Sequence, residues 1–186
     1  MLSLCAHKAG GPVGAGALLI RNDLPIKPLI IGGKQELGRR AGTENIPAIV
    51  GFAQLVRDVA HCPDAKKWLE WREWLQGELT QAAPDAVVFG AGAPRLANTL
   101  NISMPGVKSE TQLMNFDLAG FAVSSGSACS SGRVAASAML LAMGVKPELA
   151  ECALRISWGW ATTRTEIEAF ADAWKAMHLR IARKTA

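Results

Sequence analysis

Residues 5–20 read CAHKAGGPVGAGALLI, in which a histidine and a lysine precede a glycine-rich turn and an apolar run. The run at 15–20 predicts a buried strand that follows the turn. Lys8, beside His7, has the setting of a Schiff-base lysine, because cationic or apolar neighbours activate an amine. A solvated lysine at the start of a strand is the alternative, and composition alone favours it.

Helical and alternating apolar spacings follow one another along the rest of the chain. This predicts a helix at 46–60, a second one that ends at about 82, a third that begins at 109, a fourth at 135–143 and a last one that begins at about 163. Further strands are expected at 86–89, 100–104, 121–123 and 154–158. The sequence SETQ at 109–112 has the form of a capping box, and Gly144 is expected to close the helix at 135–143. The alternation predicts an α/β fold with mixed or antiparallel strands in its second part. The one break suited to a domain boundary is Cys-Pro-Asp at 62–64.

The composition excludes several classes of protein. With 49% apolar and 19% charged residues among 186, the chain is neither a disordered acidic tail nor a solvated coil. No uncharged apolar run reaches the roughly 18 to 20 residues of a membrane-spanning helix, and glycine and proline break the stretch at 9–20 too often for a signal peptide. The net charge of +4 is scattered, with Arg39–Arg40 the only tight basic pair outside the ends. We therefore expect neither nucleic acid nor a membrane as a partner.

The cysteine spacing indicates the compartment. Four cysteines, at 5, 62, 129 and 152, form no CxxC pair and have no zinc-ligand spacing. This predicts free thiols in a reducing compartment, and hence a cytoplasmic protein without a metal site. Cys5, Cys62 and Cys152 are expected to be small buried hydrophobes, and the tryptophans at 68, 71 and 74 to belong to a core.

The segment GRRAGTEN at 38–45 could bind a phosphate. Glycines, two arginines and the Thr43 hydroxyl stand just before a predicted helix, whose N-terminal N–H groups and dipole favour an anion. The alternative is that Thr43 or Asn45 is an ordinary helix cap and that the arginines are solvated.

Two later segments also offer reactive or binding side chains. In SSGSACSSG at 124–132, Cys129 is the only reactive group among small residues, which makes the segment either a nucleophile loop or a linker. In LRISWG at 154–159, Arg155 interrupts an apolar strand. Its guanidinium suits a carboxylate, and an arginine facing solvent is equally compatible with the pattern.

Together these segments resemble the cysteine desulfurases of the iron–sulfur-assembly and nitrogen-fixation kind, which are pyridoxal-phosphate enzymes of the class V aminotransferase family. The matching motifs are CAHKAGGPVGAGALLI, GRRAGTENIPAIVGFA, NTLNISMPG, SSGSACSSG and LRISWGWATTRTEIEAF, spread over residues 5–170. The resemblance implies the C-terminal part of a fold type I transferase. Residues 1–59 would be the end of the large cofactor-binding domain, and 60–186 the small α/β domain with the cysteine loop.

The resemblance also implies roles for single residues near the cofactor. Lys8 would form the Schiff base with pyridoxal phosphate, and His7 would lie beside the cofactor phosphate. Cys5 would lie there too, at a position where the family usually has serine. Thr43 would reach the phosphate of the other subunit's cofactor in a homodimer.

Cys129 would take sulfur from L-cysteine as a persulfide and leave alanine, while Arg155 would hold the substrate carboxylate. A sulfur-acceptor scaffold protein would be the partner, and the resemblance also allows a transient contact between Cys129 and an iron–sulfur cluster.

The sequence also departs from the family. Members are about twice as long, and their first half supplies the ring that stacks on the cofactor and the acid that binds its pyridine nitrogen. The segment at 31–36 is slightly shorter than the family's loop. Two alternatives therefore stay open: a non-catalytic remnant or partner-binding domain, and a selenocysteine lyase or other class V enzyme. With that half absent, residues 1–45 are expected to be mobile or aggregation-prone and the part from 61 onward better folded.

Overall fold

A computed structural model of the chain describes residues 1–22, 24–60, 64–126 and 137–185. The chain divides into two compact units, Met1–Pro63 (unit 1) and Asp64–Ala186 (unit 2). The division falls a few residues after the boundary expected between 59 and 60. The assignment of the two units to the large and small domains of the family stays a prediction.

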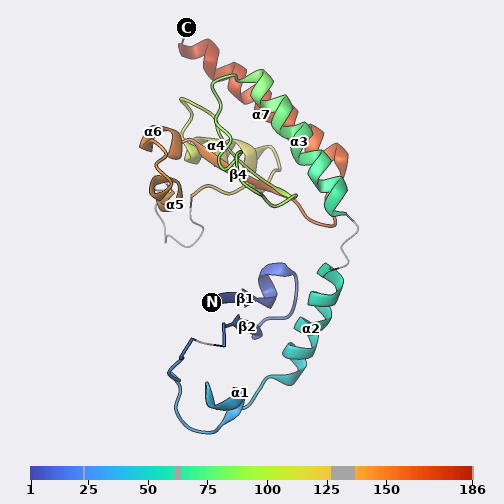
Figure 1. The fold of residues 1–186 in the computed structure, drawn as a ribbon. Helices are drawn as coiled ribbons and strands as arrows, with labels where there is room; N and C mark the ends of the chain where they lie inside the picture. The colour runs from blue at the N-terminus through green and yellow to red at the C-terminus, as the bar shows by residue number, and fades with distance from the viewer. Residues whose placement is uncertain (23, 61–63, 127–136, 186) are drawn as a thin grey trace. The chain divides into compact units, whose positions relative to one another are not determined.

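Unit 1 consists of a hairpin, short turns and one long helix (Figure 1). Its elements are β1 (Leu2–Cys5), the 3₁₀ helix η1 (Ala6–Ala9), β2 (Gly16–Leu19), α1 (Gln35–Gly38) and α2 (Ile46–Ala60). The helix predicted at 46–60 and the strand predicted at 15–20 are confirmed. The strand β1 was not anticipated from the sequence, because four residues give too short an alternation.

The side chains of unit 1 are largely exposed. β1 and β2 pair antiparallel, and every residue of both strands is exposed, so the expectation of a buried strand at 15–20 is wrong. A sheet of two four-residue strands is too narrow to bury either of its faces by itself. Among the described residues of unit 1, only the alanines at 6, 41 and 48 are buried.

Unit 2 has the larger core. Its elements are α3 (Ala65–Ala82), β3 (Thr99–Ser103), α4 (Ser109–Leu118), α5 (Ala138–Ala142), α6 (Pro147–Ala150), β4 (Ala153–Ser157) and α7 (Arg164–Thr185). β3 and β4 pair antiparallel, as expected for this part of the chain, with Leu100 opposite Ile156 and Ile102 opposite Leu154. These four side chains alternate along the strands onto one face, where α3 and α7 add their apolar sides.

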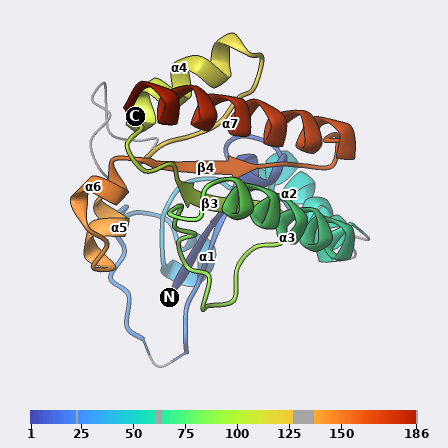
Figure 2. The ribbon, with the colours of Figure 1, turned by 90° about the horizontal axis from the view of Figure 1, so that it is seen from above.

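Helices α3 and α7 run side by side (Figures 1 and 2). Trp71, Leu75 and Trp174 are buried between the helices and the sheet, and Trp68 and Trp74 pack at the edge of this core. The expectation that the three clustered tryptophans belong to a core is therefore confirmed.

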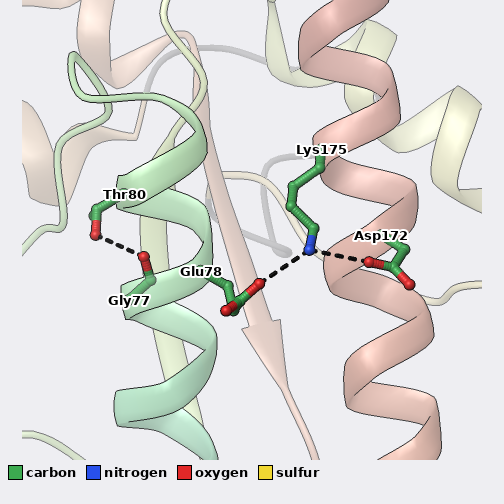
Figure 3. A network of polar contacts seen from close by, with 5 residues as sticks. All are labelled: Gly77, Glu78, Thr80, Asp172 and Lys175. Atoms are coloured by element: carbon green, nitrogen blue, oxygen red, sulfur yellow. Dashed lines mark hydrogen bonds and ion pairs between the residues drawn. The ribbon is translucent and has the colours of Figure 1, made fainter.

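One polar network joins the two helices outside the core. Lys175 of α7 lies 3.0 Å from Glu78 of α3 and 3.0 Å from Asp172 one turn earlier (Figure 3). Hydrogen bonds first to Asp172 and then to Glu78 raise the pKa of Lys175 above its ordinary value. The Lys175 ammonium thus links α3 to α7 at the edge of the core.

Two predicted strands are not strands in the structure. At 86–89 there is only an isolated bridge between Val88 and Ile102, since the Ser103 hydroxyl accepts the Val87 N–H at 2.9 Å. At 121–123 the backbone is irregular, and the adjacent Ser124 forms an isolated bridge with Arg155. The sheet therefore has two regular strands flanked by single bridges.

The predicted capping box at 109–112 is also wrong. Helix α4 does begin at Ser109, but Ser109 is already helical and buried. Gln112 is buried too, and its amide donates to the carbonyls of Val107 and Cys152 at 2.8 Å each. The amide thus joins the start of α4 to the segment before β4 instead of capping the helix.

Capping residues are observed at α5 and at the start of α7. The helix expected at 135–143 begins at 138 in the described part of the chain, where the Ser137 hydroxyl accepts the Leu140 N–H, and Gly144 follows its end with φ of 80°. At the start of α7, Thr163 and Glu166 form a reciprocal capping box, with the Thr163 N–H 2.7 Å from the carboxylate.

Candidate functional site

The end of β1 brings together the thiol, imidazole and amine singled out by the first motif. Cys5 is the last residue of the strand, and η1 carries His7 and Lys8 directly after it. All three side chains are exposed, and Cys5 Sγ lies 3.0 Å from His7 Nδ1. The expectation that Cys5 is a small buried hydrophobe is therefore wrong, since all four residues of its strand are exposed.

The turn that carries Lys8 is fixed by its backbone. Ala6 is fully buried, its N–H donates to the Ala15 carbonyl at 3.1 Å, and its carbonyl accepts from Gly11 at 3.0 Å. Gly10 ends the turn in the left-handed region, with φ of 86°. Lys8 thus projects from a closed turn rather than from a free loop.

The second motif lies against the first within unit 1. A Cβ atom added to Gly14 would lie 3.2 Å from Nδ2 of Asn45, so the turn after Lys8 adjoins the segment that contains Thr43. Asn45 Oδ1 accepts the Ala48 N–H at 3.3 Å, which confirms the helix-cap interpretation for Asn45. The Thr43 side chain is exposed.

Arg40 shapes the same segment. Its Nη1 donates to the carbonyls of Ala41 at 3.1 Å and Gly42 at 3.0 Å. The Arg40 guanidinium is therefore hydrogen-bonded to its own segment and is not simply solvated. Arg39 and Arg40 also border a groove of about 560 Å³ between β2 and α2, whose floor includes Leu18 and Phe52.

In unit 2, Arg155 lines a hollow. Its neighbours Leu154 and Ile156 are buried on the core face of β4, so Arg155 projects from the opposite face, where it is exposed. The hollow has a volume of about 450 Å³ and is lined by Asn101, Gly126, Ser137, Ala138, Met139, Leu140, Ala153 and Arg155. The Arg155 N–H donates to the Ser124 carbonyl at 2.7 Å, and the Ser124 N–H donates to the Arg155 carbonyl at 3.1 Å.

Cys129 lies outside the described residues. The residues that bracket the undescribed segment 127–136 are described, and both Gly126 and Ser137 line the hollow that contains Arg155. The two described residues that flank the segment containing Cys129 therefore both lie at this hollow.

Of the remaining cysteines, Cys152 differs from Cys5. Cys152 is buried, as expected, and burial raises the pKa of its thiol. Cys62 lies outside the described residues.

Two features of the site were not predicted from the sequence. Asn101 stands opposite Arg155 in the strand register and lines the same hollow, and its buried Oδ1 has no hydrogen-bond partner among the residues that the structure describes. The NTLNIS motif contains this asparagine, but only the register shows that it faces the arginine. The contact between Cys5 and His7 likewise depends on the turn, which the sequence pattern does not specify.

Within the described ranges, none of the helices combines the length and apolar character that crossing a bilayer requires. The same residues include no cluster of three or more His, Cys, Asp or Glu side chains suited to a metal ion.

Comparison with known proteins identifies the family. The model of the aminotransferase class-V family matches residues 1–170. The chain is 41% identical over 170 residues to a cysteine desulfurase of Enterobacter agglomerans, and 38% identical over 169 residues to cysteine desulfurase 2 of Trichormus variabilis. Each alignment covers 90% of this chain and 42% of the relative.

The fold comparison agrees. A NifS-like protein from Rickettsia africae superimposes with a TM-score of 0.79 at 34% identity, over 95% of this chain and 46% of that one. The chain thus spans less than half the length of the relatives that it matches, and the predicted fold class, part of a fold type I transferase, is confirmed. These likenesses and the residues described above establish that the chain belongs to the class V aminotransferase family.

Proposed function

We propose that the chain is the C-terminal part of a cysteine desulfurase, which converts L-cysteine to L-alanine and carries the sulfur as a persulfide on Cys129. The observation that carries the proposal is the hollow in unit 2. It is lined by Arg155 and by both residues that bracket the segment containing Cys129. A carboxylate-binding group and a nucleophilic thiol are the two functions that this reaction asks of the small domain, and the relatives named above support it.

The side chains of unit 1 fit one side of pyridoxal phosphate. The Lys8 amine suits the aldehyde and the His7 imidazole can donate to the phosphate, while the Thr43 hydroxyl is a donor suited to the phosphate of the partner subunit's cofactor. No carboxylate in the motifs of this chain suits the pyridine nitrogen, so the rest of the fold would have to supply that partner. When bound, the cofactor supplies the electron sink that weakens the carbon–sulfur bond of the substrate.

The residues of this chain then have separate tasks. Arg155 holds the carboxylate of L-cysteine with two parallel hydrogen bonds, which fixes the orientation of the substrate. The Cys129 thiolate forms a bond to the substrate sulfur as the carbon–sulfur bond breaks, and the released carbon takes up a proton to become alanine. A reducing cytoplasm keeps the thiol available for this step.

The partners follow from this chemistry. The persulfide on Cys129 must pass its sulfur to an acceptor thiol, which we assign to a scaffold protein for iron–sulfur assembly. In a homodimer, Thr43 would donate to the phosphate held by the partner subunit.

The proposal is tested in a completed protein, in which this chain is joined to the portion of the fold that it does not span. With pyridoxal phosphate bound, the protein should show the visible absorbance of a lysine imine, and Lys8→Ala should abolish it. Cys129→Ser should keep this absorbance but form no persulfide when L-cysteine is added.

Two results would contradict the proposal. A completed protein that binds the cofactor through Lys8 but forms neither alanine nor persulfide would favour a non-catalytic, partner-binding role. Turnover that is insensitive to Cys129→Ser would favour a class V enzyme that needs no thiol.

A further inference from the structure

Asn101 is the residue that faces Arg155 across the sheet. The two stand opposite each other in the register of β3 and β4. The N–H and carbonyl of Arg155 pair with Ser124 on the other edge of β4, and the Asn101 carbonyl accepts the Phe89 N–H at 2.9 Å on the other edge of β3. The backbone groups of this pair therefore point away from each other, which is the kind of antiparallel pair whose opposite side chains lie closest.

Both side chains of the pair lie on the face of the sheet away from the core. Leu100 and Ile102, on either side of Asn101, are fully buried in the core, so strand alternation directs Asn101 to the other face. Arg155 reaches that face in the same way, and both residues line the hollow of about 450 Å³. An amide and a guanidinium thus meet in one space large enough for a small ligand.

The Asn101 amide has an unused acceptor. Its Oδ1 is buried and has no hydrogen-bond partner among the residues that the structure describes. A buried carbonyl oxygen without a donor costs free energy, so a donor is expected to reach it. The described side chains that line the hollow offer two donors besides this amide, the Arg155 guanidinium and the Ser137 hydroxyl. Ser137 lies at the start of α5, whereas Arg155 is the direct neighbour of Asn101 on the next strand.

We propose that Asn101 is a positioning residue for substrate binding, whose Oδ1 accepts an N–H of the Arg155 guanidinium. A guanidinium has five N–H donors, and a carboxylate bound side-on takes two of them, so others remain for Asn101. The hydrogen bond holds the long arginine side chain in one orientation before the ligand arrives, which lowers the entropy that binding costs. The inference rests on the proposed function, because the ligand it concerns is the carboxylate of L-cysteine.

The test measures binding apart from turnover. In the completed protein loaded with pyridoxal phosphate, L-alanine is titrated, and the change in cofactor absorbance gives its dissociation constant. L-Alanine has the carboxylate of the substrate but no sulfur, so Cys129 takes no part. Asn101→Leu removes the acceptor and nearly keeps the size of the side chain. It should raise the dissociation constant on the order of fivefold, and the KM for L-cysteine by a similar factor, with kcat nearly unchanged.

Three comparisons separate positioning from a structural role. In the Arg155→Lys background, Asn101→Leu should have little further effect, because the guanidinium that Asn101 orients is already absent. Asn101→Ala should weaken binding as much as Asn101→Leu, whereas a role in packing would make the smaller residue alone harmful. Thr99→Ala is the matched control and should bind L-alanine like the wild type. Thr99 lies two residues earlier on the same face of β3, opposite Ser157, and does not line the hollow.

An unchanged dissociation constant for L-alanine in Asn101→Leu would overturn the proposal. An equal loss of affinity in the wild-type and Arg155→Lys backgrounds would overturn it as well, as would a lower kcat at unchanged affinity, since Asn101 would then act on another group. A completed wild-type protein that binds L-alanine but forms none from L-cysteine would instead contradict the proposed function, and the dissociation constants would still decide the role of Asn101.

Discussion

Arg155 shows how the position of one residue in a strand determines what its side chain can do. Leu154 and Ile156 on either side are buried, so strand alternation places the guanidinium on the face away from the core. There it shares a hollow with Asn101, its partner in the register. This position gives the guanidinium access to a ligand while the strand holds its backbone fixed.

Arg155→Lys in a completed protein should weaken the affinity for L-cysteine more than it changes the cofactor absorbance. A lysine ammonium cannot reproduce the two parallel hydrogen bonds of a guanidinium to a carboxylate. Loss of one charge-assisted hydrogen bond costs on the order of 1.5 to 3 kcal/mol, which should appear as a higher KM in steady-state assays. Unchanged kinetics with L-cysteine would mean that Arg155 does not contact the substrate.

At the scale of elements, helix α7 depends on the box that begins it. The Thr163 N–H and hydroxyl both donate to the Glu166 carboxylate, at 2.7 Å and 2.8 Å, and the Thr163 hydroxyl accepts the Glu166 N–H at 3.3 Å. The hydrogen bond from the Thr163 N–H, and to a smaller extent the one from its hydroxyl, lower the pKa of Glu166 below its ordinary value. A lowered folded-state pKa stabilises the fold above the pH range in which an unfolded glutamate titrates, and this stabilisation is lost as the pH falls through the folded-state pKa.

Thr163→Ala should destabilise unit 2 by about 1 kcal/mol at neutral pH, because that is the usual cost of losing a threonine that caps a helix. The difference from the wild type should narrow as the pH falls, because the hydroxyl then donates to a protonated acid. All six tryptophans lie in unit 2, at 68, 71, 74, 158, 160 and 174, so fluorescence during urea unfolding measures this unit alone.

Thr165→Ala is the matched control, because Thr165 is an exposed residue in the first turn of the same helix. Thr165→Ala should change the free energy of unfolding little, both at neutral pH and in acid. If Thr165→Ala cost as much as Thr163→Ala, or if the cost of Thr163→Ala were the same in acid, the box would not be the cause.

The helices were the most predictable elements. Apolar residues recur at helical spacing over α2, α3 and α7, and capping side chains mark the starts of α2 and α7. Helix α1 could not be predicted, because Glu36 and Leu37 adopt left-handed φ values of 50° and 60° that non-glycine residues rarely take.

The site was predictable as motifs but not as contacts. His7, Lys8 and Arg155 were identified from their neighbours in sequence. The closeness of Cys5 to His7 depends on a turn, and that of Asn101 to Arg155 on a strand register. Neither is visible in a single sequence, because both require knowing which backbone segments pair.

At the scale of the whole molecule, the two units differ in how much apolar surface they bury. Unit 2 encloses a core that includes Trp174, Phe116 and Leu100, whereas the described part of unit 1 buries three alanines. Unit 1 leaves Leu29 97% and Ile31 90% exposed, so little apolar burial stabilises it.

Amide hydrogen exchange followed by mass spectrometry should show this difference. In the 186-residue chain, amides of β3, β4 and the buried part of α7 should exchange far more slowly than those of β1 and β2, because the hairpin has no core to protect it. Joining the chain to the portion of the fold that it does not span should slow exchange in the hairpin and leave β3 and β4 nearly unchanged. Equal protection of both units in the 186-residue chain would show that unit 1 is stable by itself.

The most direct test of the account is alanine production from L-cysteine, measured with pyridoxal phosphate for the 186-residue chain and for the completed protein in parallel. The completed protein should turn over and should lose turnover with Lys8→Ala. The 186-residue chain should form no alanine above background, because no motif carboxylate suits the pyridine nitrogen and unit 1 buries so little. Sustained turnover by the 186-residue chain with stoichiometric cofactor would contradict the account, as would a completed protein that binds the cofactor and yields no alanine.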